Sequence, residues 1–148
     1  MNKFPLLGLL AIAWATPQAS AQDAICPALP AGSNLHWQQQ AGNGFTVCRA
    51  LDGERQVIGV MLTSSPTVNL QRRNREEEGS IGAYEVHWYQ PEIAVSTGER
   101  KRVTIVELGD DRYAQVWVDA ANDAELRQLV SSAEGTALSS REPTLALC

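Results

Sequence analysis

Apolar and polar residues alternate over several short runs of the chain, a pattern typical of β-strands that bury one face. The run at 57–63 is instead almost continuously apolar, as expected of a central strand. Such runs predict about six strands, at 35–39, 45–50, 57–63, 81–90, 100–108 and 112–119.

Turn sequences separate these runs. Asn43-Gly44 and Asp52-Gly53 each contain a glycine, which accepts the positive φ of tight turns without steric cost. Gly109-Asp110-Asp111 joins the last two strands into a hairpin. Because tight turns connect antiparallel neighbours, we expect a mostly antiparallel sheet.

One helix is predicted near the C-terminus. Asn122 can cap it, and Glu125 stands three residues later, as in a capping box. Gly135 is a suitable stop. The apolar side chains between them recur at helical spacing and need a surface to cover them, namely Leu126, Leu129, Val130 and Ala133. The fold class is therefore α+β, with the helix packed on one face of the sheet.

The N-terminus is predicted to be a cleaved signal peptide, residues 1–21. Lys3 precedes an apolar run at 6–15, which is too short to span a bilayer, and Ala19-Ser20-Ala21 is an A-x-A cleavage signal. A buried N-terminal helix or a retained anchor is the alternative. We expect a bacterial protein that is periplasmic or secreted. An irregular arm at 22–34 and a single domain at 35–148 would follow.

The charge balance narrows the classes of partner. The chain has 17 acidic and 12 basic residues among 148, for a formal net charge of −5. An acidic surface argues against nucleic-acid binding. No transmembrane segment is expected in the mature chain. We expect an envelope protein or a small ligand as partner, and a monomer or weak dimer.

All three cysteines lie after the predicted cleavage site. In an oxidising compartment one disulfide is the default, and three pairings are possible. We favour Cys26–Cys48, which would tie the N-terminal arm to a strand. Cys48–Cys148 is the rival, and an unpaired Cys148 could instead link two chains.

A polar row marks the strand at 81–90. Alternation places Glu85, His87 and Tyr89 on one face, with Trp88 on the other. Glu85 could orient His87 as a general base, with Tyr89 as a proton donor. The simpler interpretation is the solvated face of a sheet. No nucleophile is evident, and the two histidines lack the accompanying ligands of a zinc site, so we assign no catalytic residue, metal or cofactor.

The segment at 71–79 reads QRRNREEEG, a basic cluster followed by an acidic one. It lacks a core-facing stripe and is predicted to be a loop or a short helix. It could be solvated and paired with itself. Alternatively Arg72, Arg73 and Arg75 could dock a protein partner of mixed charge, since guanidinium groups bind carboxylates in a bidentate manner.

These features favour a small exported binding or accessory protein without catalysis, for example an inhibitor-type module. Its contacts would come from Arg72, Arg73 and Arg75 together with the Glu85, His87 and Tyr89 face. One alternative is a periplasmic hydrolase with His87 as general base. Another is a structural or assembly protein that dimerises through Cys148 or an edge strand.

Overall fold

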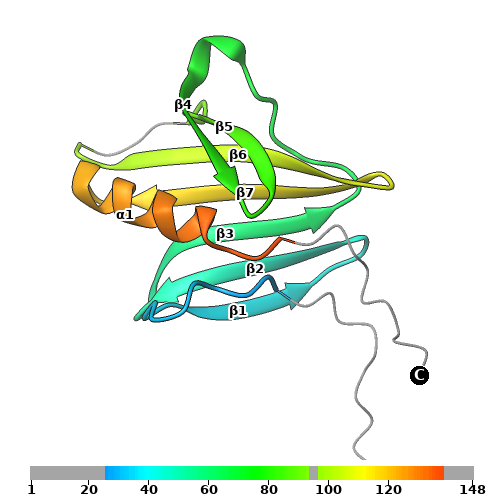
Figure 1. Cartoon of the computed structure of the whole chain (residues 1–148), viewed down its shortest axis with the longest axis horizontal. Helices are drawn as coiled ribbons and strands as arrows, with labels where there is room; N and C mark the ends of the chain where they lie inside the picture. Colours follow the sequence, from blue (N-terminus) through cyan, green and yellow to red (C-terminus); the bar gives the residue numbers. More distant parts are fainter. Residues whose placement is uncertain (1–25, 94–96, 139–148) are drawn as a thin grey trace, which may run out of the picture.

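A computed structural model describes residues 26–93 and 97–138, which form one antiparallel sheet with a helix on one face (Figure 1). The strand order is β1-β2-β3-β7-β6-β5-β4. The strands are β1 (His36–Ala41), β2 (Phe45–Asp52), β3 (Arg55–Thr63), β4 (Arg75–Ile81), β5 (Tyr84–Tyr89), β6 (Arg100–Gly109) and β7 (Arg112–Ala120). The predicted α+β class is confirmed, with seven strands instead of about six. The predicted signal peptide and Cys148 lie outside the described residues.

The additional strand comes from the charged segment at 71–79. A 3-10 turn, η1 (Arg72–Asn74), opens it, and β4 follows. β4 joins β5 through a tight turn in which Gly82 has a φ of 59°. A glycine at the first position of such hairpin turns adopts this positive φ without steric cost. β4 is an edge strand and most of its residues are exposed, so it needs no regular apolar alternation. The sequence pattern therefore did not predict it.

The helix α1 (Asp123–Glu134) covers the middle of the sheet and contacts β7 most extensively. Its predicted cap is confirmed, since the Asn122 side chain accepts a hydrogen bond from the Glu125 N–H. Its buried stripe comprises Leu126, Leu129 and Ala133. The core beneath it contains fully buried Ile58, Val60, Val116, Val118 and Trp88.

The β4–β5 hairpin leaves the plane of the main sheet and lies on the same face as α1 (Figure 1). β5 pairs with β6 at a single register position, Tyr89 with Val103. The Trp88 indole N–H donates to Glu134 Oε1 at 3.1 Å, and the Gly82 N–H donates to the Glu134 carbonyl at 3.2 Å. The hairpin turn is thus fixed at the C-terminal end of α1, and the other end of the hairpin projects beyond β6.

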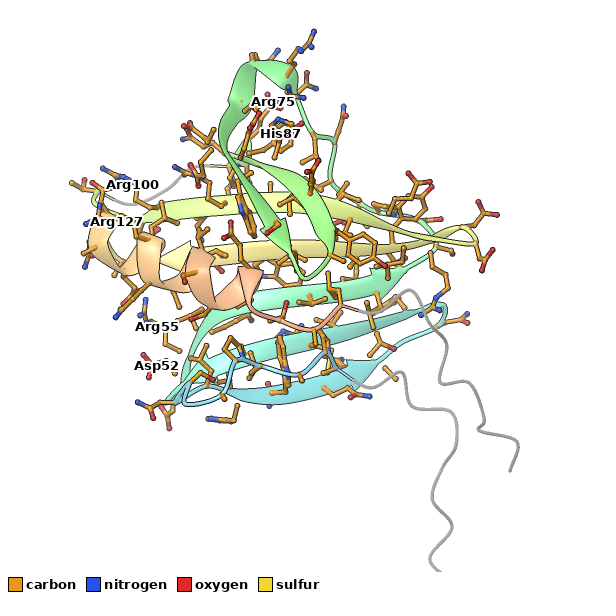
Figure 2. The ribbon with its side chains drawn as sticks, viewed as in Figure 1. Asp52, Arg55, Arg75, His87, Arg100 and Arg127 are labelled. Carbon is orange, nitrogen blue, oxygen red and sulfur yellow. A yellow bond between two sulfur atoms is a disulfide. The ribbon has the colours of Figure 1, made fainter. Side chains whose placement is uncertain are left out.

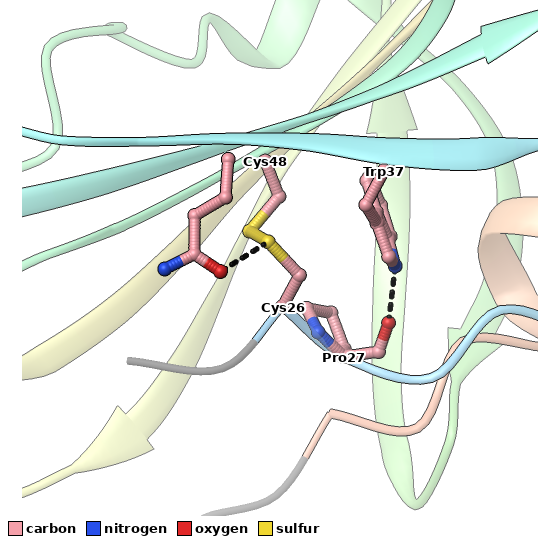
Figure 3. The surroundings of a disulfide bond; sticks show 5 residues. Cys26, Pro27, Trp37 and Cys48 are labelled. Carbon is pink, nitrogen blue, oxygen red and sulfur yellow. Dashed lines mark hydrogen bonds between the residues drawn. A yellow bond between two sulfur atoms is a disulfide. The ribbon is translucent and has the colours of Figure 1, made fainter. Parts of the chain in front are cut away.

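A disulfide and a hydrogen bond fasten the N-terminal arm to β1 and β2 (Figure 3). Cys26 and Cys48 form a disulfide with a Cα–Cα distance of 5.8 Å, which confirms the favoured pairing. The Trp37 indole N–H donates to the Pro27 carbonyl at 2.7 Å. This arm therefore covers part of β1 and β2 on the face that also carries α1.

The other face of the sheet is only partly covered. The chain between β3 and η1 crosses it, because the backbone N–H groups of Thr67 and Val68 donate to Gln115 Oε1 of β7. Trp117 lies on this face across Gly59 of β3, so closely that a Cβ at Gly59 would come within 1.9 Å of the indole. Trp88 belongs to the core and Trp37 packs against it, whereas Trp117 lies on the other face of the sheet.

Candidate functional site

The row of Glu85, His87 and Tyr89 lies on the face of β5 that points away from Trp88 and the core, as predicted. His87 Nε2 is 2.9 Å from Glu78 Oε1, which belongs to the neighbouring strand and is the cross-strand partner of His87. Glu85 is paired with Ser80 instead. The carboxylate expected to orient His87 therefore comes from β4, and the sequence spacing along β5 did not reveal it.

The Glu78–His87 pair is open to solvent. The His87 side chain is 37% exposed and that of Glu78 is 81% exposed. Water therefore screens their interaction. The Thr104 hydroxyl donates to the His87 carbonyl at 2.7 Å and fixes the backbone, without reaching the imidazole. A histidine beside a carboxylate can transfer a proton. Among the described residues, however, no serine, threonine or cysteine side chain is hydrogen-bonded to the His87 imidazole, as a nucleophile would be.

The three arginines of the charged segment lie at the projecting end of the hairpin, where Arg75 is labelled in Figure 2. Arg73 forms an ion pair with Glu92, and the Asn74 side-chain amide donates to the same carboxylate at 3.2 Å. Hydrogen bonds from Arg73 and then Asn74 hold the pKa of Glu92 below its usual value. The segment before β4 is thereby joined to the segment after β5.

Arg75 is held differently. Its guanidinium carbon lies 5.7 Å from the centroid of the Tyr89 ring, and Nη2 donates to the phenol oxygen at 3.2 Å. Arg72 is exposed and has no side-chain partner among the described residues. Two of the three guanidinium groups are therefore positioned by neighbouring side chains within the part of the chain that the structure describes.

An apolar side chain accompanies these charges. Ile93 is 58% exposed and directly follows Glu92. We call this surface the arginine tip and define it by Arg72, Arg73, Asn74, Arg75, Tyr89, Glu92 and Ile93. Sequence reasoning missed Glu92 and Ile93, because only the folded hairpin brings 91–93 beside η1.

Two glutamates in the acidic half of the charged segment contact residues outside that segment. Glu77 Oε1 accepts a hydrogen bond from Arg102 Nε at 2.8 Å, and Glu78 contacts His87. Neither glutamate contacts Arg72, Arg73 or Arg75. Among the described residues, no ion pair joins Arg72, Arg73 or Arg75 to the glutamates that follow them at 76–78.

A shallow groove of about 480 Å³ lies between α1 and β4. Its apolar side chains are Leu126 and Val130, and its charged ones are Glu77, Glu78, Arg102, Asp123, Arg127 and Glu134. Arg102 is paired with Glu77 and Asp123 with Arg100, at 2.8 Å each. Arg102 and Glu77 therefore compensate each other within the groove, whereas Arg100, the partner of Asp123, is not among its lining residues. His87 and the arginine tip also lie outside the groove.

Within 26–93 and 97–138, no three His, Cys, Asp or Glu side chains gather closely enough to hold a metal ion. None of the helices in this part of the chain has the length and apolarity to cross a membrane. No protein-family model, curated protein or solved structure matches the chain.

Proposed function

We propose that this protein is an exported, non-catalytic binding or accessory protein of the bacterial envelope, and that it docks a protein partner through the arginine tip. The observation that carries the proposal is the geometry of Arg72, Arg73 and Arg75. They lie at the projecting end of the β4–β5 hairpin, and no ion pair among the described residues joins them to the glutamates at 76–78.

The composition of the tip suits a protein more than a small anion. Arginine and aromatic residues are enriched in the centres of protein interfaces, and an exposed apolar side chain can serve as an anchor in a pocket of the partner. Ile93 supplies such an anchor, next in the chain to Glu92, the ion-pair partner of Arg73. We expect the partner to present carboxylates around an apolar pocket.

The preformed shape of the tip also favours binding. Arg73 and Asn74 are fixed on Glu92, and Arg75 is fixed on Tyr89, so these side chains lose less conformational freedom when a partner docks. The net charge of the chain is −5. A basic tip on an acidic molecule gives the encounter a preferred orientation.

Export rests on the sequence of residues 1–21 and remains a prediction. The Cys26–Cys48 disulfide supports it, because such bonds persist in oxidising compartments. Microscopy or fractionation of the source cell would test it. Mass spectrometry of the purified protein would test cleavage after Ala21.

A charge-reversal experiment tests the binding proposal. The mature protein and an Arg72→Glu, Arg73→Glu, Arg75→Glu variant are immobilised and exposed to an envelope extract of the source cell. The matched control reverses Arg49, Arg112 and Arg127, which lie outside the tip. Circular dichroism first establishes that all three fold. We expect a partner retained by the wild type and the control and lost by the tip variant. Equal retention by all three would contradict docking through the tip.

The Glu78–His87 pair supports one alternative, a hydrolase with His87 as general base. His87→Ala should abolish any hydrolytic activity found in a substrate screen while leaving the fold intact. Under the binding proposal the same variant retains the partner, because His87 lies outside the arginine tip.

A further inference from the structure

The two edge strands of the sheet differ in how they are protected against pairing. β4 carries Arg75, Glu76, Glu77 and Glu78 and has a register shift in its pairing with β5. Charges and bulges of this kind discourage a further strand from adding to an edge. β1 reads HWQQQA, with no proline, lysine, arginine or carboxylate, and pairs with β2 without a register shift.

The uncharged edge is also rigid. Its inner side is paired with β2 along its whole length. The Trp37 indole N–H donates a hydrogen bond to the Pro27 carbonyl, and the Gln40 side chain accepts one from Arg49 Nη1 at 2.9 Å. The Cys26–Cys48 disulfide holds the arm against the same two strands. Among the described residues β1 pairs with β2 alone, so its outer backbone groups form a preordered template.

We propose that β1 pairs antiparallel with β1 of a second copy of this chain, about a two-fold axis perpendicular to the sheet. Opposite residues then point to the same face. A register centred on Gln38 sets Gln38 against its own counterpart and His36 against Gln40. Glutamine amides both donate and accept hydrogen bonds, so this edge is complementary to itself, and no carboxylate or ammonium meets its like.

The size of the contact determines its strength. Stable protein interfaces bury at least roughly 1200 Å² of surface. We expect one pair of six-residue strands with mostly exposed polar side chains to bury less than this. The dimer is therefore weak, and its population depends on protein concentration. It uses the edge of the sheet that is farthest from β4 in strand order, so the arginine tip stays available in both copies.

Sedimentation velocity over a wide concentration range tests this proposal on the mature chain. We expect reversible dimerisation of the wild type, and the same behaviour in Cys148→Ser, which rules out a disulfide link. Gln38→Lys and Gln38→Glu should each weaken dimerisation roughly fivefold, since like charges would oppose each other across the axis. An equimolar mixture of the two variants should restore it as a heterodimer.

The matched control is Ser80→Lys, which adds the same charge to the other edge strand, at an exposed position of β4. It should dimerise like the wild type. A wild type that stays monomeric at all concentrations would overturn the proposal. So would dimerisation that Cys148→Ser abolishes, or that Gln38→Lys leaves unchanged.

Discussion

The guanidinium of Arg75 lies over the ring of Tyr89, 5.7 Å from its centroid, and donates a hydrogen bond to the phenol oxygen. This contact unites two features that are separate in the sequence, the charged segment and the polar row of β5. Arg75 and Tyr89 are register partners across the hairpin. The register of β4 against β5 therefore determines the shape of the arginine tip.

The first prediction concerns this contact. A double-mutant cycle with Arg75→Gln and Tyr89→Leu should give a coupling free energy of about 0.5–1 kcal/mol, as expected of a cation–π pair at an exposed site. Urea unfolding of the wild type, both single variants and the double variant measures it. If the changes in unfolding free energy of the two single variants simply add up in the double variant, the two side chains do not interact.

The second prediction concerns Gly59, which leaves room for the Trp117 indole. Gly59→Ala should lower the free energy of unfolding by about 1–3 kcal/mol, because the added methyl group forces the indole to move. In a Trp117→Leu background the same substitution should cost less. Denaturant unfolding of the four proteins tests this, and an equal cost in both backgrounds would mean that the indole is not the obstacle.

The third prediction concerns the disulfide. Cys26 and Cys48 have a sequence separation of 22, so the bond closes a loop of moderate length. Reduction should lower the free energy of unfolding by about 3 kcal/mol, because the open chain gains conformational entropy when it unfolds. Unfolding curves with and without reductant measure the difference. A Cys26→Ala, Cys48→Ala variant is the control. It should be as unstable as the reduced wild type and should not respond to reductant.

The fourth prediction concerns acid stability. A hydrogen bond from Arg55, followed by one from the Ala121 N–H, holds the pKa of Glu125 below its usual value. A carboxyl group with a lowered pKa in the folded state stabilises the fold above its unfolded-state pKa. This contribution is lost as the pH falls through the folded-state pKa.

Glu125→Gln should therefore cost stability at neutral pH and cost less at pH values below the folded-state pKa. Thermal unfolding as a function of pH tests this. Glu54→Gln is the control, since Glu54 is an exposed carboxylate next to Arg55 in the sequence. If Glu125→Gln cost the same stability at every pH, the effect would come from packing and not from the charge.

Much of the main sheet could be predicted from the sequence because its pattern is local. The 100–119 hairpin alternates cleanly, and the Asn122 and Glu125 pair marks the start of α1. One detail differs, since the Glu125 carboxylate accepts the N–H of Ala121 instead of that of the cap residue. β4 was missed because an edge strand at the surface needs no regular apolar alternation.

The candidate site could be predicted only in part. Strand alternation correctly placed Glu85, His87 and Tyr89 on one face. The partner of His87 depends on the register between β4 and β5, and that register contains a shift between Arg75 and Glu78. No spacing along one strand encodes such a shift. Likewise, Glu92 meets Arg73 only because the hairpin brings their two segments together.

Photo-crosslinking from within the arginine tip tests most directly whether a protein partner docks there. A benzoylphenylalanine probe replaces Ile93, and in a control protein it replaces Phe45, which is 41% exposed and lies outside the tip. Both proteins are illuminated in an envelope extract of the source cell. We predict one discrete adduct from position 93 that disappears when Arg72 and Arg73 are changed to glutamate, and no such adduct from position 45. The same adduct from both positions, or one from position 93 that survives the charge reversal, would contradict docking through the arginine tip.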